Sequence, residues 1–193
     1  MGQLNGYASV PHNTYDAFRA YALANGVNVD YSYGNQCWDI CALLWWQYGL
    51  RLETGNGLAY GCWTLMRYTN ARGPFKLIYN IGDVRRGDVL VFNGYGSYYT
   101  GHIGFADENY RGGNTINLLG QNQGQGISWG KTSIVKPWSL THFLGAFRNS
   151  NWSGSPPTPG PTPPGPPSPV SKLGDGTFPW VLYAEKLRKT NML

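Results

Sequence analysis

The chain has 193 residues, which is enough for one domain with a hydrophobic core and short extensions. Only 13% of the residues are charged, and the formal net charge of +5 is not gathered into a basic run, so we expect no nucleic-acid partner. No stretch approaches the about 20 apolar residues of a membrane span. The opening residues, MGQLNGYASVPHN, lack the apolar core of a signal peptide. We therefore expect synthesis in the cytoplasm of the producing cell without a secretory signal.

The first half of the chain has the pattern of helices. Asn13 or Thr14 is placed to cap a helix over 15–25 that stops at Gly26. A third helical pattern covers 58–68. Between them, 36–48 predicts a helix that Gly49 ends, with one apolar stripe made of Cys37, Ile40, Cys41, Leu44 and Tyr48.

From Phe75 onward the pattern changes to strands. Short runs rich in β-branched and aromatic residues are separated by Gly-rich turns, and they cover 75–79, 87–92, 102–107, 114–121 and 142–149. Helices first and strands afterwards predict an α+β domain over 1–150, with N-terminal helices packed on a mostly antiparallel sheet.

A proline-rich linker follows over 151–171. Residues 155–169, SPPTPGPTPPGPPSP, hold nine of the thirteen prolines, which predicts a solvated polyproline II spacer. The remaining tail, 172–193, is too short to fold alone. Its end, PWVLYAEKLRKTNML, has near-helical apolar spacing. Two interpretations stay open, a docking helix that folds on a partner and a frayed tail.

The three cysteines, Cys37, Cys41 and Cys62, argue by their odd number against a disulfide framework. Cys37 is expected at a helix N-terminus, where free N–H groups and the helix dipole lower a thiol pKa and favour a nucleophilic thiolate. Cys41 lies one turn deeper, and Cys62 sits between Gly61 and Trp63, so both are expected to be core residues. A zinc site is disfavoured because the chain has no paired ligand spacing.

Three histidines are candidate bases for that thiol. His102 is the first residue of an apolar strand after a glycine turn, whereas His142 has no polar neighbour to orient it and His12 is expected at the surface. A lone histidine at a strand start is weak evidence for catalysis, and for His102 in isolation a structural role is favoured. Asn122 or Gln121 could orient the ring, and Cys, His, Asn is the papain-type order.

Gln36, immediately before the cysteine, is a candidate to help its backbone N–H bind an oxyanion. The stretch NVDYSYGNQCWD also carries hard oxygen ligands around a glycine-containing turn, from Asn28, Asp30 and Asp39. Such alternation suits calcium, and the alternative is an Asx-turn that caps the helix. Tyr95, Tyr98, Tyr99 and Trp129 could line a groove or be ordinary loop aromatics.

Five segments together resemble the CHAP family, the cysteine, histidine-dependent amidohydrolases/peptidases. They are YGNQCWD, RRGDVLVF, TGHIGFAD, LLGQNQG and THFLGAFR, in that order over about residues 10–149. The resemblance implies a papain-like fold with Cys37 as nucleophile, His102 as general base and Asn122 as orienting residue. Some relatives also carry a glutamate two residues before that asparagine, and here the position is Gly120.

The resemblance further implies a phage lysin that cleaves an amide bond of bacterial peptidoglycan through a cysteine acyl-enzyme. Either an N-acetylmuramoyl-L-alanine amidase or an endopeptidase would act in this way, without an organic cofactor. Calcium-binding relatives predict a metal site at Asn28, Asp30 and Asp39, with carbonyls of Ser32 and Gly34.

The site of action implied is the cell wall, by one of two routes. One is a free endolysin, and the other is a virion component held through its tail by a phage tail protein or another virion protein. A rival hypothesis is a catalytically idle wall-binding or phage tail structural protein that keeps the fold. The presence of both Cys37 and His102 favours the enzyme, because a binding protein needs neither.

Overall fold

The computed structural model describes residues 7, 9–124 and 132–152, and they belong to a compact unit over Met1–Gly160. The predicted linker beyond residue 152, the predicted tail and Trp129 lie outside the described residues. None of the helices in the described part is long and apolar enough to cross a membrane.

The three predicted helices are present. α1 is Tyr15–Ala24, and the Thr14 hydroxyl accepts the Ala17 N–H at 3.2 Å as its N-terminal cap. α2 is Cys37–Gln47, so the cysteine is its first residue, as predicted. α3 is Gly61–Met66, shorter than the predicted 58–68, because the Asn56 side chain accepts the Leu58 N–H and fixes a turn there.

Six strands form one sheet in the order β1-β6-β2-β3-β4-β5, and each neighbouring pair is antiparallel. A short 3-10 turn, η2 (Ile81–Asp83), follows the first strand. The strands are β1 Phe75–Ile78, β2 Val89–Phe92, β3 His102–Ala106, β4 Thr115–Gly120, β5 Ile134–Ser139 and β6 Phe143–Asn149. The sequence did not predict β5, because Pro137 argues against a strand; its place at the edge of the sheet tolerates a proline.

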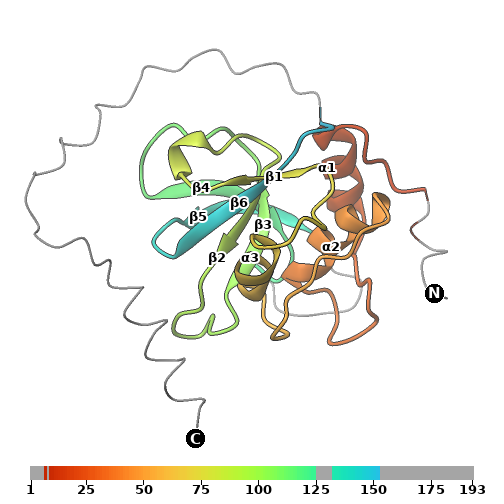
Figure 1. Ribbon diagram of the computed structural model, residues 1–193, viewed down its shortest axis with the longest axis horizontal. Coiled ribbons are helices and arrows are strands. Elements are labelled where there is room, and N and C mark those ends of the chain that lie inside the picture. Colours follow the sequence, from red (N-terminus) through yellow and green to blue (C-terminus); the bar gives the residue numbers. More distant parts are fainter. Residues whose placement is uncertain (1–6, 8, 125–131, 153–193) are drawn as a thin grey trace, which may run out of the picture. The chain divides into compact units, whose positions relative to one another are not determined.

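The helices cover one face of the sheet, where the larger hydrophobic core lies. In Figure 1, α1 and α2 lie together beside the sheet. Phe18 and Ile40, from these two helices, pack in one cluster with Phe105 and Phe147 of the sheet. A second cluster, which includes Leu90, Phe92, Ala106, Leu118 and Trp138, fills the other face. The predicted α+β arrangement of N-terminal helices on an antiparallel sheet is thus confirmed.

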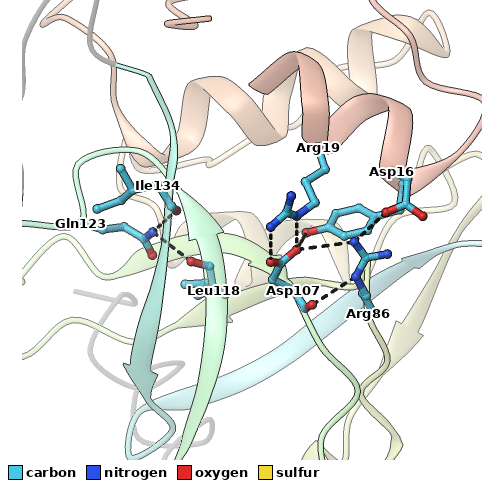
Figure 2. A network of polar contacts seen from close by, with 8 residues as sticks. Asp16, Arg19, Arg86, Asp107, Leu118, Gln123 and Ile134 are labelled. Carbon is cyan, nitrogen blue, oxygen red and sulfur yellow. Dashed lines mark hydrogen bonds and ion pairs between the residues drawn. The ribbon is translucent and has the colours of Figure 1, made fainter. Parts of the chain in front are cut away.

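Ion pairs fasten α1 to the end of β3. Arg19 donates to both carboxylate oxygens of Asp107, at 2.6 and 2.8 Å, and the Tyr15 hydroxyl donates to the same carboxylate at 2.8 Å. Arg86 donates to Asp16 at 2.6 Å and to the Asp107 carbonyl at 3.1 Å (Figure 2). This network fixes the helix layer against the sheet that carries His102.

Candidate active site

Cys37 occupies the first turn of α2, with 8% of its surface exposed. Burial raises the pKa of its thiol to about 11, although main-chain hydrogen bonds with Ile103, Trp38 and Cys37 itself act in the opposite direction. The sequence predicted a lowered pKa from the helix N-terminus. Desolvation outweighs that effect here, so the resting thiol is protonated at neutral pH.

Cys41 and Cys62 are fully buried, with no exposed surface, and neither is in a disulfide. Burial raises the pKa of both thiols well above the ordinary value. Both residues belong to the core cluster between helices and sheet, as predicted.

His102 is the first residue of β3 and is 3% exposed. Its ring stacks on Trp138, with centroids 4.1 Å apart and planes 22° apart, and its Nε2 lies 3.3 Å from Oε1 of Gln123. Burial lowers the pKa of His102 to about 4; the Lys136 charge acts in the same direction, and the Gln123 hydrogen bond acts against it. The ring is therefore neutral at neutral pH and free to accept a proton.

The hydrogen bonds of Gln123 identify which ring nitrogen accepts that proton. Its Nε2 donates to the carbonyls of Leu118 (3.1 Å), Gly120 (3.3 Å) and Ile134 (2.9 Å), two of which Figure 2 shows. Its Oε1 is thereby turned toward His102. An amide oxygen only accepts hydrogen bonds, so Nε2 of the neutral imidazole must carry the hydrogen and Nδ1 must carry the lone pair.

α2 packs on β3, but the His102 ring stacks on Trp138, a member of the cluster on the face of the sheet opposite the helices. Cys37 interacts with the main chain of Ile103, the residue that follows His102. Among the hydrogen bonds of the described residues, His102 bonds to Gln123 and not to the thiol. Catalytic hydrogen bonds commonly form only when the substrate is bound. The catalytic pairing of Cys37 with His102 stays a prediction.

The residues proposed to orient the ring have separate positions. Asn122 has a left-handed backbone, with φ of 53°, and turns the chain after β4. Gln121 points to the helix side: its Oε1 accepts the Val27 N–H at 2.8 Å, and its Nε2 donates to the Val27 and Gln36 carbonyls at 2.8 and 3.0 Å. The described hydrogen bonds of His102 include neither residue, and a direct orienting role for Asn122 stays a prediction.

Gln36 caps α2 through its main chain. Its N–H donates to Asp39 Oδ2 at 2.7 Å, and its carbonyl accepts from the Asp39 N–H at 3.2 Å and from Gln121. The Gln36 carbonyl and the Cys37 N–H belong to one planar peptide unit, so these bonds also fix the direction of that N–H. The role of Gln36 in oxyanion binding remains a prediction, in which the Cys37 N–H is the hydrogen-bond donor to the oxyanion.

The loop predicted to bind calcium has features that fit a cation. Asn28 is 5% exposed, and both polar atoms of its side chain are without a hydrogen-bond partner. Asp39 is 1% exposed, and burial raises its carboxyl pKa to about 7, with the charge of Asp30 acting in the same direction. The orphaned Asn28 amide oxygen and the Asp30 and Asp39 carboxylates, whose charges repel, are oxygen donors of the kind that calcium prefers.

Part of this loop is already occupied by its own hydrogen bonds. Asp39 Oδ1 accepts the Val29 N–H at 2.8 Å, and Asp30 Oδ1 accepts the Ser32 N–H at 2.8 Å, which is the Asx-turn alternative. Gly34 has a left-handed backbone, with φ of 75°. The described residues contain no group of three or more His, Cys, Asp or Glu that could hold a metal ion, so a calcium site would depend on amide and carbonyl oxygens.

The other two histidines contribute nothing to this site. His12 Nδ1 donates to the Val10 carbonyl at 2.8 Å, and His142 stacks on Tyr95 with ring centroids 4.0 Å apart. The Tyr95 ring contacts Tyr98, which in turn contacts Trp138. The loop before β3, which carries Tyr95, Tyr98 and Tyr99, is therefore joined by ring contacts to Trp138, the ring that covers His102. In this loop, Tyr99 is 72% exposed.

Sequence reasoning missed two residues at this site, Gln123 and Trp138. Gln123 lies in the same polar run as the asparagine, QNQG, and the only available signal was a second amide one residue further on. Trp138 belongs to β5, a strand that the sequence pattern did not predict because it contains Pro137.

Comparison with known proteins agrees with this geometry. The CHAP domain family profile matches residues 26–122, half of the chain, including Cys37 and His102. Among the solved structures, a wild-type endolysin, LysIME-EF1, is similar, with a TM-score of 0.58 and 22% identity, and the match covers 72% of this chain and 65% of that one. That similarity shows the fold. No curated protein sequence matches the chain. The chain belongs to the CHAP domain family.

Proposed function

We propose that this protein is an endolysin-like peptidoglycan hydrolase that cleaves an amide bond through a cysteine acyl-enzyme. One observation carries the proposal. The first residue of a helix is a cysteine, and that helix packs on the strand whose first residue is a histidine with a fixed tautomer. In the proposed mechanism, the lone pair of Nδ1 accepts the thiol proton.

The proposed reaction is acyl transfer. Cys37 Sγ attacks the carbonyl carbon of the amide while His102 Nδ1 takes the thiol proton, and the Cys37 N–H supports the oxyanion. The C–N bond then breaks, and the imidazolium gives its proton to the leaving amine. Water, activated by the same ring, hydrolyses the thioester and releases a carboxylic acid. Burial raises the pKa of the thiol to about 11 and lowers that of His102 to about 4, so both groups are neutral at rest, and the proton must leave the thiol as its sulfur bonds to the carbonyl carbon.

The burial of both groups supports one rival function, a catalytically idle wall-binding protein. Cys37 is 8% exposed and His102 is 3% exposed, so substrate reaches them only where the site opens. A binding protein would sediment with purified peptidoglycan and release nothing. The enzyme releases fragments, and this difference separates the two functions.

Mass analysis of the released fragments tests the proposal and identifies the bond. An N-acetylmuramoyl-L-alanine amidase separates intact stem peptides from glycan strands, whereas an endopeptidase leaves muramoyl groups that carry shortened peptides. Either pattern from purified peptidoglycan supports the hydrolase. Binding without any soluble product would overturn it in favour of the wall-binding protein.

Calcium is proposed as a structural ion of the loop before α2. Asn28, Asp30 and Asp39 would supply side-chain oxygens, and Ser32 and Gly34 would supply carbonyls. The ion would relieve the repulsion between the carboxylates and brace the helix end that holds Cys37. Added calcium should raise the melting temperature of chelator-treated protein, and Asp30→Asn should reduce that increase. An identical melting temperature with calcium and with chelator would contradict the proposed calcium site.

Whether the protein acts as a free endolysin or as a virion component is a separate proposal, which rests on the tail predicted from the sequence. Virion attachment through residues 172–193 predicts that the full chain co-purifies with phage particles and that a chain of residues 1–154 does not. Equal recovery of the two proteins would contradict attachment through the tail.

A further inference from the structure

We propose that Gln123 is the residue that positions the histidine base, in the place that the sequence-based prediction gives to Asn122. The role of His102 as a base rests on the proposed function, whereas the contacts of Gln123 with the His102 ring do not. The argument uses the contacts of one amide group, the room that it occupies and the charges around the ring.

The first step is the contact itself. Gln123 Oε1 lies 3.3 Å from His102 Nε2, and it is the side-chain acceptor that the described residues offer this ring. Both residues are buried, with 1% of Gln123 and 3% of His102 exposed. A hydrogen bond in such a place is shielded from competition by water.

The second step is that the amide cannot turn over. Its Nε2 has three carbonyl acceptors, from Leu118, Gly120 and Ile134, which belong to β4 and β5. The Gln123 carbonyl also accepts from the Lys136 ammonium at 2.7 Å. A flipped amide would place its oxygen against three carbonyl oxygens. Both strands therefore hold Oε1 toward the ring.

The third step is the space that Gly120 leaves. A Cβ at position 120 would lie 3.2 Å from Gln123 Cδ and 3.3 Å from its Oε1, which is closer than most real contacts of a Cβ. A side chain at 120 would thus compete with the Gln123 amide for the place beside the ring. Because position 120 is a glycine, the polar group beside the His102 ring is the amide of Gln123, three residues further along the chain.

The fourth step concerns charge. Trp138 covers one side of the ring and Cys37 lies on the helix packed against β3, so neither brings a formal charge in its resting form. Lys136 is the charged group that acts on the ring, and it is a cation. The Gln123 amide orients the His102 ring without adding a charge beside it. The consequence is a neutral imidazole held as its Nε2–H tautomer, with the lone pair on Nδ1.

Nitrogen NMR of the imidazole rings tests this tautomer without any substrate. With ¹⁵N-labelled histidine, and the His102 signals identified by their loss in His102→Gln, we expect the Nε2–H form in the wild type. His12 is an internal control, because its Nδ1 faces a carbonyl and should show the opposite tautomer. In Gln123→Met, which removes the acceptor at similar volume, we expect the His102 signals to move toward a mixture of tautomers.

A kinetic comparison follows the same variants. Loss of a buried hydrogen bond of this kind should lower the maximal rate of fragment release about ten-fold, with a smaller change in the peptidoglycan concentration for half-maximal rate. Asn122→Gly removes the neighbouring side chain and keeps the left-handed backbone. Gln123→Met should be the more damaging of the two.

Gly120→Ala gives a second test that keeps every polar group. The added methyl should displace the Gln123 amide and shift the His102 tautomer in the same direction as Gln123→Met, by a smaller amount. An Nδ1–H tautomer in the wild type, or an unchanged tautomer in both Gln123→Met and Gly120→Ala, would overturn the proposal. A greater kinetic loss in Asn122→Gly than in Gln123→Met would also overturn it. A wild-type protein that digests nothing but shows the expected tautomers would reject the proposed function alone.

Discussion

His102 is buried beside one cation and an amide, and these neighbours set the pH range in which it can act as a base. Burial first, and the Lys136 charge second, lower its pKa from 6.5 to about 4. The protonated ring has no lone pair for the thiol. The ring is neutral above about pH 4, so the active form persists to lower pH than an ordinary histidine would allow.

The pH dependence of fragment release should show this directly. Release from dilute peptidoglycan should fall as the pH drops through about 4, not through 6.5, because the acid limb reports the histidine in the free enzyme. Lys136→Met removes the cation and should move the acid limb to higher pH. A wild-type limb near 6.5 would show that the ring is solvated in the active protein.

Sequence patterns select Cys37 and His102 as candidate site residues but not Gln123, and the reason is physical. Helical periodicity and a strand start are local properties, so 36–48 and the run from His102 could be assigned from the letters alone. The direction of the Gln123 side chain depends on the left-handed turn at Asn122 and on a carbonyl of β5. Neither is encoded in local spacing.

Among the elements, the turn after β4 is tied to the segment before α2 by one side chain, Gln121. It is 1% exposed and makes three hydrogen bonds to the main chain of Val27 and Gln36. These bonds join the histidine side of the site to the cysteine side. They also hold the peptide unit that ends in the Cys37 N–H.

Gln121→Met should therefore cost about 2 kcal/mol of unfolding free energy, because the buried Val27 N–H and carbonyl lose their partner and the Gln36 carbonyl keeps only the Asp39 N–H. Gln47→Met is a matched control, since Gln47 is half-buried and donates a single described bond, to the Tyr7 carbonyl at 3.1 Å. Denaturant unfolding of the two variants measures the difference. Equal losses of unfolding free energy in the two variants would contradict the role of Gln121 in joining the turn after β4 to the segment before α2.

The contact of α1 with β3 gives a second prediction at this scale. Asp107→Asn should destabilise the protein by about 1–3 kcal/mol, because it removes the charge that Arg19 bonds twice in a largely buried position. Asp16→Asn breaks the ion pair of an aspartate whose side chain is 75% exposed, and should cost less than about 1 kcal/mol. Thermal melts of both proteins test the order. A larger loss from Asp16→Asn would contradict it.

Strand β5 shows where element prediction from sequence fails. The letters IVKPWS contain a proline, which cannot donate to a neighbouring strand, and the pattern therefore argues against a strand. The strand exists because it lies at the edge of the sheet and needs partners on one side only. Edge position is a property of the whole sheet and cannot be read from one segment.

For the molecule as a whole, the packing of Trp152 bears on the predicted domain boundary. Its ring packs against Tyr15, Phe18 and Phe105, and its Nε1 donates to the His12 carbonyl at 2.8 Å. The order of helices and strands predicted the α+β class. The boundary predicted at residue 150 stays a prediction; Trp152 lies just beyond it, and a single aromatic after the final strand carries no periodic signal.

Truncation tests the boundary. A chain of residues 1–154 should melt close to the full chain, whereas 1–149 should lose roughly 2–4 kcal/mol with the half-buried ring of Trp152. Trp152→Ala in the full chain should reproduce the loss seen in 1–149. Equal melting temperatures for 1–149 and 1–154 would place the boundary earlier than Trp152.

The most direct test of the hydrolase is digestion of purified peptidoglycan by the wild type, Cys37→Ala and Cys41→Ala, with mass analysis of the soluble products. Cys41→Ala controls for the loss of a buried thiol on the same helix. We expect fragments from the wild type and from folded Cys41→Ala, and none from folded Cys37→Ala. Release of the same fragments by Cys37→Ala would contradict the assignment of Cys37 as the nucleophile.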